Sequence, residues 1–155
     1  MKSAIVVALL LTLAVAITPT KGDEIVKQLQ GQTLDGEIFL IFFYDPTCCH
    51  EPHTTMNDDV KKDIEDKILS TPNGKKYIFY EVDTSDMDMK KLNKLVSVDE
   101  YQTKHGPTVF IGAEGEGFWA HGEDSADKIL AKVAQFDRIK AESIEKIQKR
   151  DTLIN

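Results

Sequence analysis

The sequence predicts an α/β domain in which helices flank a central mixed sheet of about four strands. Residues Ile38–Tyr44 form a continuous apolar run, which is typical of a strand buried on both faces of a parallel or mixed sheet. Segments with helical spacing of apolar residues precede and follow this run, so strands and helices alternate along the chain. With 155 residues, of which 41% are hydrophobic, the chain has room for one ordinary domain and a tail.

The first residues have the composition of a secretory signal peptide. Lys2 supplies a positive charge, and an uncharged, mostly apolar run of 14 residues follows it at Ala4–Ile17. As a helix this run would span about 21 Å, short of the roughly 30 Å hydrocarbon core of a membrane. Ala14–Ala16 matches an A-x-A cleavage site. We therefore expect a signal peptide at residues 1–16, with cleavage as late as residue 22 as the alternative.

Cleavage would deliver the mature chain to the endoplasmic reticulum lumen or to the extracellular space, where disulfides persist. The C-terminal residues Asp151–Asn155 are not a KDEL-type retention signal. After cleavage we expect no association with a membrane. The net charge of −7 and the lack of a long basic block in the sequence argue against binding of nucleic acid.

Helices are predicted wherever apolar residues recur at helical spacing. Ahead of the last segment they cover Asp23–Gln30, Thr54–Leu69 and Met87–Val96. The clearest stripe has an apolar residue at every fourth position, namely Met56, Val60, Ile64 and Ile68. The inward face of the third helix is expected to consist of Met89, Leu92 and Leu95.

Three further strands complete the predicted sheet, at Tyr77–Val82, Pro107–Ile111 and Phe118–His121. The glycine-rich turn Gly112–Gly117 makes the last two strands an antiparallel hairpin. The connector Val98–His105 is expected to be irregular. A final helix is predicted to begin near Ala126, with Ser125 as its N-cap.

The segment Phe43–Glu51 has the sequence Phe-Tyr-Asp-Pro-Thr-Cys-Cys-His-Glu. It resembles the active-site segment of the protein disulfide isomerase branch of the thioredoxins, which typically has Phe-Tyr-Ala-Pro-Trp-Cys-Gly-His-Cys. Downstream, Gly106–Thr108 before a strand is similar to the cis-proline loop of that family. The resemblance covers residues 23–136 and implies a thioredoxin-like fold without the family's usual first strand. Residues 137–155 are then a C-terminal helical extension.

The resemblance implies thiol–disulfide chemistry on the loop after the first strand. The candidate catalytic residues there are Cys48, Cys49, His50 and Glu51. The proline loop, in which the family has a cis X-Pro bond, is expected to bind an extended client segment through Gly106, Pro107 and Thr108. The implied partners are client proteins that carry cysteines or extended segments, and no cofactor is expected.

Three positions depart from the family pattern. Glu51 replaces the second redox cysteine, Phe42 stands in place of an acidic proton carrier, and Thr47 replaces a tryptophan. A dithiol cycle needs both an attacking and a resolving cysteine. We therefore expect a degenerate active site that performs single-cysteine exchange or client capture, and at most weak activity as a thiol–disulfide oxidoreductase or isomerase.

Cys48 is the candidate for the attacking sulfur. The N-terminus of the following helix would favour its thiolate, and a protonated His50 would add to this effect, whereas Glu51 opposes it. A bridge between Cys48 and Cys49 is not the favoured state, although such a pair stays open as a redox sensor. Adjacent Cα atoms across a trans peptide are about 3.8 Å apart, whereas disulfides usually span roughly 4.4–6.8 Å.

Two other functions remain open. The chain could be a non-catalytic interaction module that uses the proline groove and the C-terminal helix, whose apolar stripe continues beyond Phe136 to Ile139, Ile144 and Ile147. Such a helix would pack on its own domain or be offered to a partner or a second copy. A zinc or copper site is less favoured, and its candidate ligands are Cys49 and His53, four residues apart.

Overall fold

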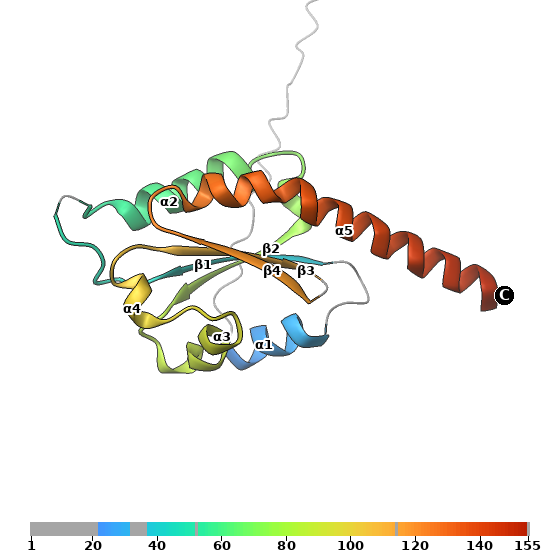
Figure 1. Ribbon diagram of the computed structural model, residues 1–155, viewed down its shortest axis with the longest axis horizontal. Coiled ribbons are helices and arrows are strands. Elements are labelled where there is room, and N and C mark those ends of the chain that lie inside the picture. Colours follow the sequence, from blue (N-terminus) through green and yellow to red (C-terminus); the bar gives the residue numbers. More distant parts are fainter. Residues whose placement is uncertain (1–21, 32–36, 52, 114, 155) are drawn as a thin grey trace, which may run out of the picture.

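A computed structural model describes residues 22–31, 37–51, 53–113 and 115–154. A four-stranded mixed sheet lies between two layers of helices, which confirms the predicted architecture (Figure 1). The predicted signal peptide, residues 1–16, lies outside the described residues. Within the described ranges no helix has the length and apolar character needed to span a membrane.

The sheet has the strand order β2-β1-β3-β4. Its central strand β1 (Ile38–Tyr44) runs parallel to β2 (Tyr77–Asp83) and antiparallel to β3 (Thr108–Ala113). The edge strand β4 (Glu116–His121) is antiparallel to β3. All of β1 except Tyr44 is buried, because helices cover both faces of the sheet. The apolar run therefore has the place that its composition predicts.

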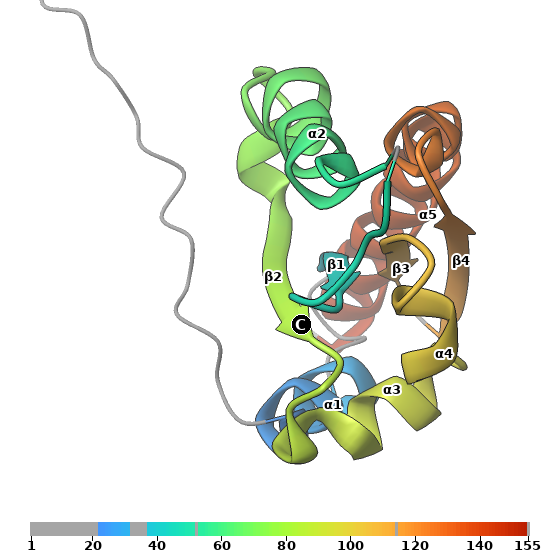
Figure 2. The same cartoon turned by 90° about the vertical axis from the view of Figure 1, so that its left-hand side faces the viewer.

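One layer of helices consists of α2 (Met56–Ile64), which continues as a π-helical turn at Glu65–Leu69, and α5 (Ser125–Ile154). The other layer contains α1 (Gly22–Gly31), α3 (Lys90–Leu95) and α4 (Glu100–Thr103). Short 3-10 turns at Gly74–Lys76 and Met87–Met89 precede β2 and α3. Figure 2 shows the two layers end-on, with α2 and α5 above the sheet and α1, α3 and α4 below it.

Each layer encloses its own hydrophobic cluster, and the cluster under α2 and α5 contains the whole predicted fourfold stripe of α2. In the other layer, Met89 and Leu92 are buried as predicted. The prediction for Leu95 is wrong, since its side chain is 42% exposed. Val96, four residues after Leu92, is the buried neighbour on that stripe. A spacing of four rather than three therefore continues the face of α3.

The connector predicted as irregular contains the short helix α4. Asp99 accepts a hydrogen bond from the Gln102 backbone N–H at 2.8 Å, and the Gln102 side chain accepts from the Asp99 N–H at 3.3 Å, which completes a capping box. Four helical residues are too few for a periodicity to show in the sequence. The prediction that Ser125 caps the final helix is wrong. The Ser125 hydroxyl is buried without a hydrogen-bond partner, and Ser125 is itself the first residue of α5.

The glycines of the predicted turn have a packing role. Gly112 and Gly117 pair with each other within β3 and β4. A Cβ atom at either position would lie 2.6 Å from the ring of Phe110, which the two glycines allow to lie flat against the hairpin. The two strands consequently extend further than the sequence predicts, and Ala113 pairs with Glu116.

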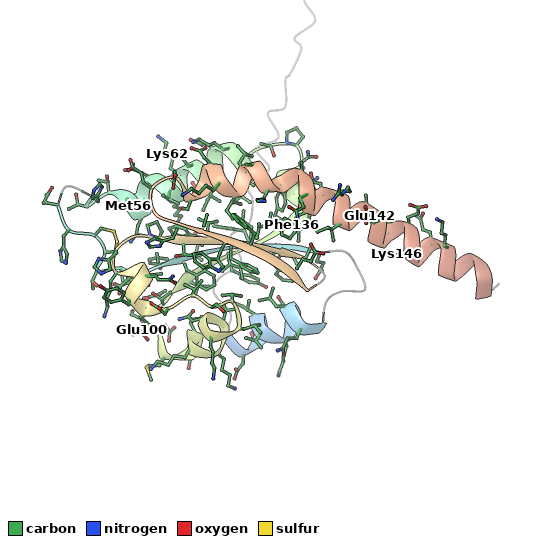
Figure 3. All side chains as sticks on the ribbon, in the orientation of Figure 1. Met56, Lys62, Glu100, Phe136, Glu142 and Lys146 are labelled. Atoms are coloured by element: carbon green, nitrogen blue, oxygen red, sulfur yellow. A yellow bond between two sulfur atoms is a disulfide. The ribbon has the colours of Figure 1, made fainter. Side chains whose placement is uncertain are left out.

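Helix α5 continues without a break for 30 residues, and both Phe136 and the half-buried Ile139 pack against the hydrophobic cluster before the helix leaves the body of the domain (Figure 1). At that point Asp137 accepts from Lys76 Nζ at 2.7 Å and from the Tyr77 hydroxyl at 3.4 Å. Burial and the Asp137 charge together raise the pKa of Tyr77. Figure 3 shows Glu142 and Lys146 on the part of the helix that stands clear of the body.

Candidate functional site

The candidate redox residues lie on the Cys loop, residues 45–55, between β1 and α2. The Cys48 backbone N–H donates to the Asp45 carbonyl at 3.0 Å and closes a β-turn. The buried Asp45 carboxylate accepts from the Thr47 N–H at 2.7 Å and from the Thr47 hydroxyl at 2.5 Å. Asn57 of α2 donates to the same Asp45 carbonyl at 2.9 Å. An acidic first residue and a proline in second place favour this turn, so the local sequence positions Cys48.

Further turns separate Cys48 from the helix. The His53 N–H donates to the His50 carbonyl at 2.9 Å, and the Met56 N–H donates to the His53 carbonyl at 3.1 Å. Helix α2 begins only at Met56, without a side-chain cap from Thr55. The expectation of a helix N-terminus at Cys48 is therefore wrong, because successive turns occupy the intervening residues. The effect of a helix dipole falls off within the first turn, so the dipole of α2 does not act on Cys48.

Cys48 and Cys49 form a disulfide with each other, contrary to the expectation from their spacing. That expectation assumed a trans peptide, whereas the Cys48–Cys49 peptide is cis and its Cα atoms are 3.0 Å apart. Both residues are half-buried, and Cys49 packs against the hydrophobic cluster under α2 and α5. Cys48 is not among the residues packed against that cluster. The site thus holds the vicinal pair that the sequence analysis did not favour.

The predicted cis bond before Pro107 is also wrong, since Cys48–Cys49 is the one cis peptide within the described ranges. The trans form is the default for X-Pro bonds by about 0.5–1 kcal/mol, and a three-residue match does not include the contacts that select the isomer. Gly106, Pro107 and Thr108 are all buried. The Pro107 carbonyl accepts from the Gly122 N–H at 2.9 Å. A Cβ atom on Gly106 would lie 3.0 Å from Met56 Sδ, so this segment packs against the start of α2.

His121, at the end of β4, is a site residue for which sequence reasoning found no signal. Its Nδ1 lies 3.1 Å from the buried Thr108 hydroxyl. Burial lowers the pKa of His121, and the nearby charges of His105 and Lys128 lower it further, while a hydrogen bond with the Pro107 carbonyl opposes this shift. The imidazole therefore favours its neutral form beside the proline segment.

This shift predicts a dependence of stability on pH. A histidine whose pKa is lower in the folded chain than in the unfolded chain binds fewer protons when folded, so its contribution is intact above the unfolded pKa. The free energy of unfolding should therefore fall as the pH drops below about 6.5. Urea unfolding of the full chain and of His121→Gln, between about pH 8 and pH 5, measures this contribution. We expect a shallower decline for His121→Gln, and equal declines would contradict the assignment.

A buried polar network supports the Cys loop from below, and the sequence analysis did not identify it. The Tyr44 carbonyl at the end of β1 accepts from the Thr84 N–H at 2.9 Å and from the Thr84 hydroxyl at 3.1 Å. The hydroxyls of Thr84 and Thr103 lie 2.6 Å apart, and Asn93 Nδ2 donates to the Thr84 carbonyl at 3.4 Å. One threonine thus connects β1 to both α3 and α4. The only sequence signal of this network is that a polar residue, Thr84, directly follows the strand β2.

The other candidate residues lie at the surface. His50, Glu51 and His53 are exposed. Cys49 is bonded to Cys48 and its sulfur is not a free ligand for zinc or copper. In the part of the chain that the structure describes, no three histidine, cysteine or acidic side chains converge as a metal site. The chemistry that the Cys loop supports directly is exchange between its disulfide and an incoming thiol.

Comparison with known proteins adds a likeness of fold. No protein-family model and no curated protein matches the chain. Among solved structures, chloroplastic thioredoxin z superposes with a TM-score of 0.50 at 12% sequence identity, over 81% of this chain and 98% of that one. Together with the β2-β1-β3-β4 sheet and its two helical layers, this shows that the chain has a thioredoxin-like fold.

Proposed function

We propose that the chain is a secretory-pathway thiol–disulfide exchange protein that captures client proteins through Cys48. The observation that carries this function is the half-buried Cys48–Cys49 pair on the loop that follows β1 of a thioredoxin-like sheet. The signal-like composition of residues 1–16 supports a location in the secretory pathway. Disulfides persist in that compartment, so the Cys48–Cys49 bond is compatible with it. The resemblance to the disulfide isomerase active-site segment supports the chemistry.

Cys48 is the better target for an incoming client, because Cys49 packs against the hydrophobic core. A client thiolate attacks Cys48 Sγ, the Cys48–Cys49 bond breaks, and its electron pair leaves as the Cys49 thiolate. The product is a mixed disulfide between the client and Cys48. The Cys49 thiolate can attack Cys48 Sγ, which closes the pair again and releases the client unchanged.

Alternatively, a second thiol of the client resolves the mixed disulfide. It attacks the client sulfur of the mixed disulfide, and Cys48 leaves as a thiolate. The client is then oxidised by two electrons and the pair is reduced to two thiols, so no further oxidant is needed in this half-reaction. In the reverse sense, the Cys48 thiolate attacks a client disulfide and forms the same intermediate.

Trapping with two cysteine variants tests this proposal. In Cys49→Ala the sulfur that releases the client is missing, so covalent complexes with luminal client proteins should accumulate. In Cys48→Ser these covalent complexes should disappear. Each variant keeps one cysteine, so the two variants carry the same number of thiols. Non-reducing gels and mass spectrometry of acid-quenched samples measure the complexes. Equal amounts in both variants would contradict the role of Cys48.

The C-terminal helix favours a second candidate function, a non-catalytic interaction module. Ile139 of α5 still packs against the hydrophobic cluster, but further along the helix projects from the body of the domain, and Ile144 is 40% exposed there (Figure 1). An apolar side chain on a projecting helix can contact a second copy or a partner protein. An oligomer or complex of the full chain that dissociates in Ile144→Glu, together with an unreactive Cys48, would favour this candidate over exchange.

A further inference from the structure

We propose that a depression between α3 and α4 binds an acidic segment of the client, next to the client's reactive cysteine. This inference rests on the proposed exchange function and names the class of client that it would take. The depression has a volume of about 830 Å³. Its positively charged and aromatic lining consists of Lys90, Lys94, Lys104 and Tyr101.

The three lysines give the depression a positive character on a chain whose net charge is −7. Their side chains are exposed, and none of the three takes part in an ion pair within the described ranges. The opposing carboxylates are Asp99 and Glu100, and that of Asp99 is already bonded in the capping box of α4. At physiological ionic strength charges are screened beyond about 8 Å, so ammonium groups in contact with the client outweigh the dispersed negative charge.

Tyr101 supplies an apolar surface beside these charges. Its side chain is 72% exposed, and its ring lies edge-on to the ring of His105, with 4.7 Å between the centroids. A tyrosine ring offers a large contact area to a polypeptide at a small cost in side-chain entropy. His105 itself does not line the depression, but it lies two residues before Pro107, so Tyr101 contacts a residue close in sequence to the buried proline segment.

The buried threonine network connects a wall of the depression to the start of the Cys loop. Asn93 lines the depression and donates to the Thr84 carbonyl at 3.4 Å, while Thr103 directly precedes Lys104 and contacts the Thr84 hydroxyl. Thr84 in turn bonds to Tyr44, the last residue before the Cys loop. Figure 2 looks onto this end of the sheet and shows the Cys loop above α3 and α4. A client segment that runs from the disulfide along this end would therefore meet the lysines.

The test compares short peptides whose single cysteine is flanked either by glutamates or by lysines. Each cysteine is activated as a mixed disulfide with thionitrobenzoate, and the full chain carries Cys49→Ala. The Cys48 thiolate attacks the peptide sulfur, and thionitrobenzoate leaves as a coloured thiolate whose absorbance gives the rate. We expect the acidic peptide to react about fivefold faster than the basic peptide, in keeping with electrostatic steering.

Matched variants locate the preference. Adding K94E/K104E should abolish or reverse it, whereas K27E/K146E, which changes the net charge equally at exposed lysines outside the depression, should leave it intact. Circular dichroism verifies that both variants are folded. Equal rates for the two peptides, or a preference that persists in K94E/K104E, would overturn the inference.

Serine versions of the two peptides separate this inference from the exchange function. Their non-covalent binding is measured by the fluorescence anisotropy of an attached dye. Suppose that the acidic serine peptide binds, that K94E/K104E weakens this binding and that no cysteine peptide reacts. The depression is then a site for acidic segments, and the proposed exchange function is wrong. If both cysteine peptides react at the same rate and neither serine peptide binds selectively, the exchange function is supported and the proposed site for an acidic segment is wrong.

Discussion

Replacing Phe136 by alanine should lower the free energy of unfolding by about 3–5 kcal/mol. The Phe136 side chain is 1% exposed and belongs to the cluster that α2 and α5 form with the sheet. Its removal leaves a cavity among the other buried side chains of this cluster, which relax only partly, so the lost contacts are not replaced. Urea unfolding of the full chain, followed by circular dichroism, measures the change.

Ile144→Ala is the matched control for Phe136. It removes an apolar side chain from the same helix, two turns further on, where the side chain is 40% exposed. Surface substitutions usually change stability by less than about 0.5 kcal/mol, and alanine is the stronger helix former. If Ile144→Ala cost as much as Phe136→Ala, the extension would be packed in solution and the proposed domain boundary at residue 136 would move.

Thr84→Val should lower the free energy of unfolding by about 2 kcal/mol. Valine keeps the shape of the side chain but removes the hydroxyl that contacts the Tyr44 carbonyl and the Thr103 hydroxyl. The threonine is fully buried, so water cannot replace these hydrogen bonds. Thermal and urea unfolding of the full chain measure the loss.

A comparison with Thr55→Val identifies the cause of this loss. The Thr55 hydroxyl donates to Asp59 at 2.7 Å on an exposed surface, so its removal should cost less than about 0.5 kcal/mol. Thr84→Ser retains the hydroxyl and should recover part of the stability that Thr84→Val loses. A Thr84→Ser variant no more stable than Thr84→Val would attribute the loss to packing of the methyl group instead of hydrogen bonding.

The elements with a long and strong pattern were predictable from the chain alone. The run Ile38–Tyr44 became β1 with the predicted bounds, and the fourfold stripe of α2 is buried throughout. These patterns are reliable because burial of apolar surface dominates the energetics, and each pattern repeats over several turns or residues. By contrast, α4 has only four residues, and its capping box stabilises it without any periodicity.

The candidate site divides in the same way. The resemblance of residues 43–51 to the disulfide isomerase segment indicated that a cysteine-bearing loop would follow β1, and the Asp45 turn forms there. The Cys48–Cys49 bond, the trans form of the bond before Pro107 and the late start of α2 were not predictable. The two isomers of an X-Pro bond differ by a small free energy, and contacts from residues far away in the sequence select between them.

Amphipathic spacing and turn chemistry thus specify the α/β order and the loop that carries sulfur, since both act between residues close in the chain. The support of that loop depends on residues from separate elements, with Thr84 after β2, Asn93 in α3 and Thr103 in α4 meeting at the end of β1. Each is an ordinary polar residue when considered alone. Their hydrogen bonds form only when the sheet and the lower helices pack together and exclude water. The tertiary structure therefore decides that these three residues support the loop.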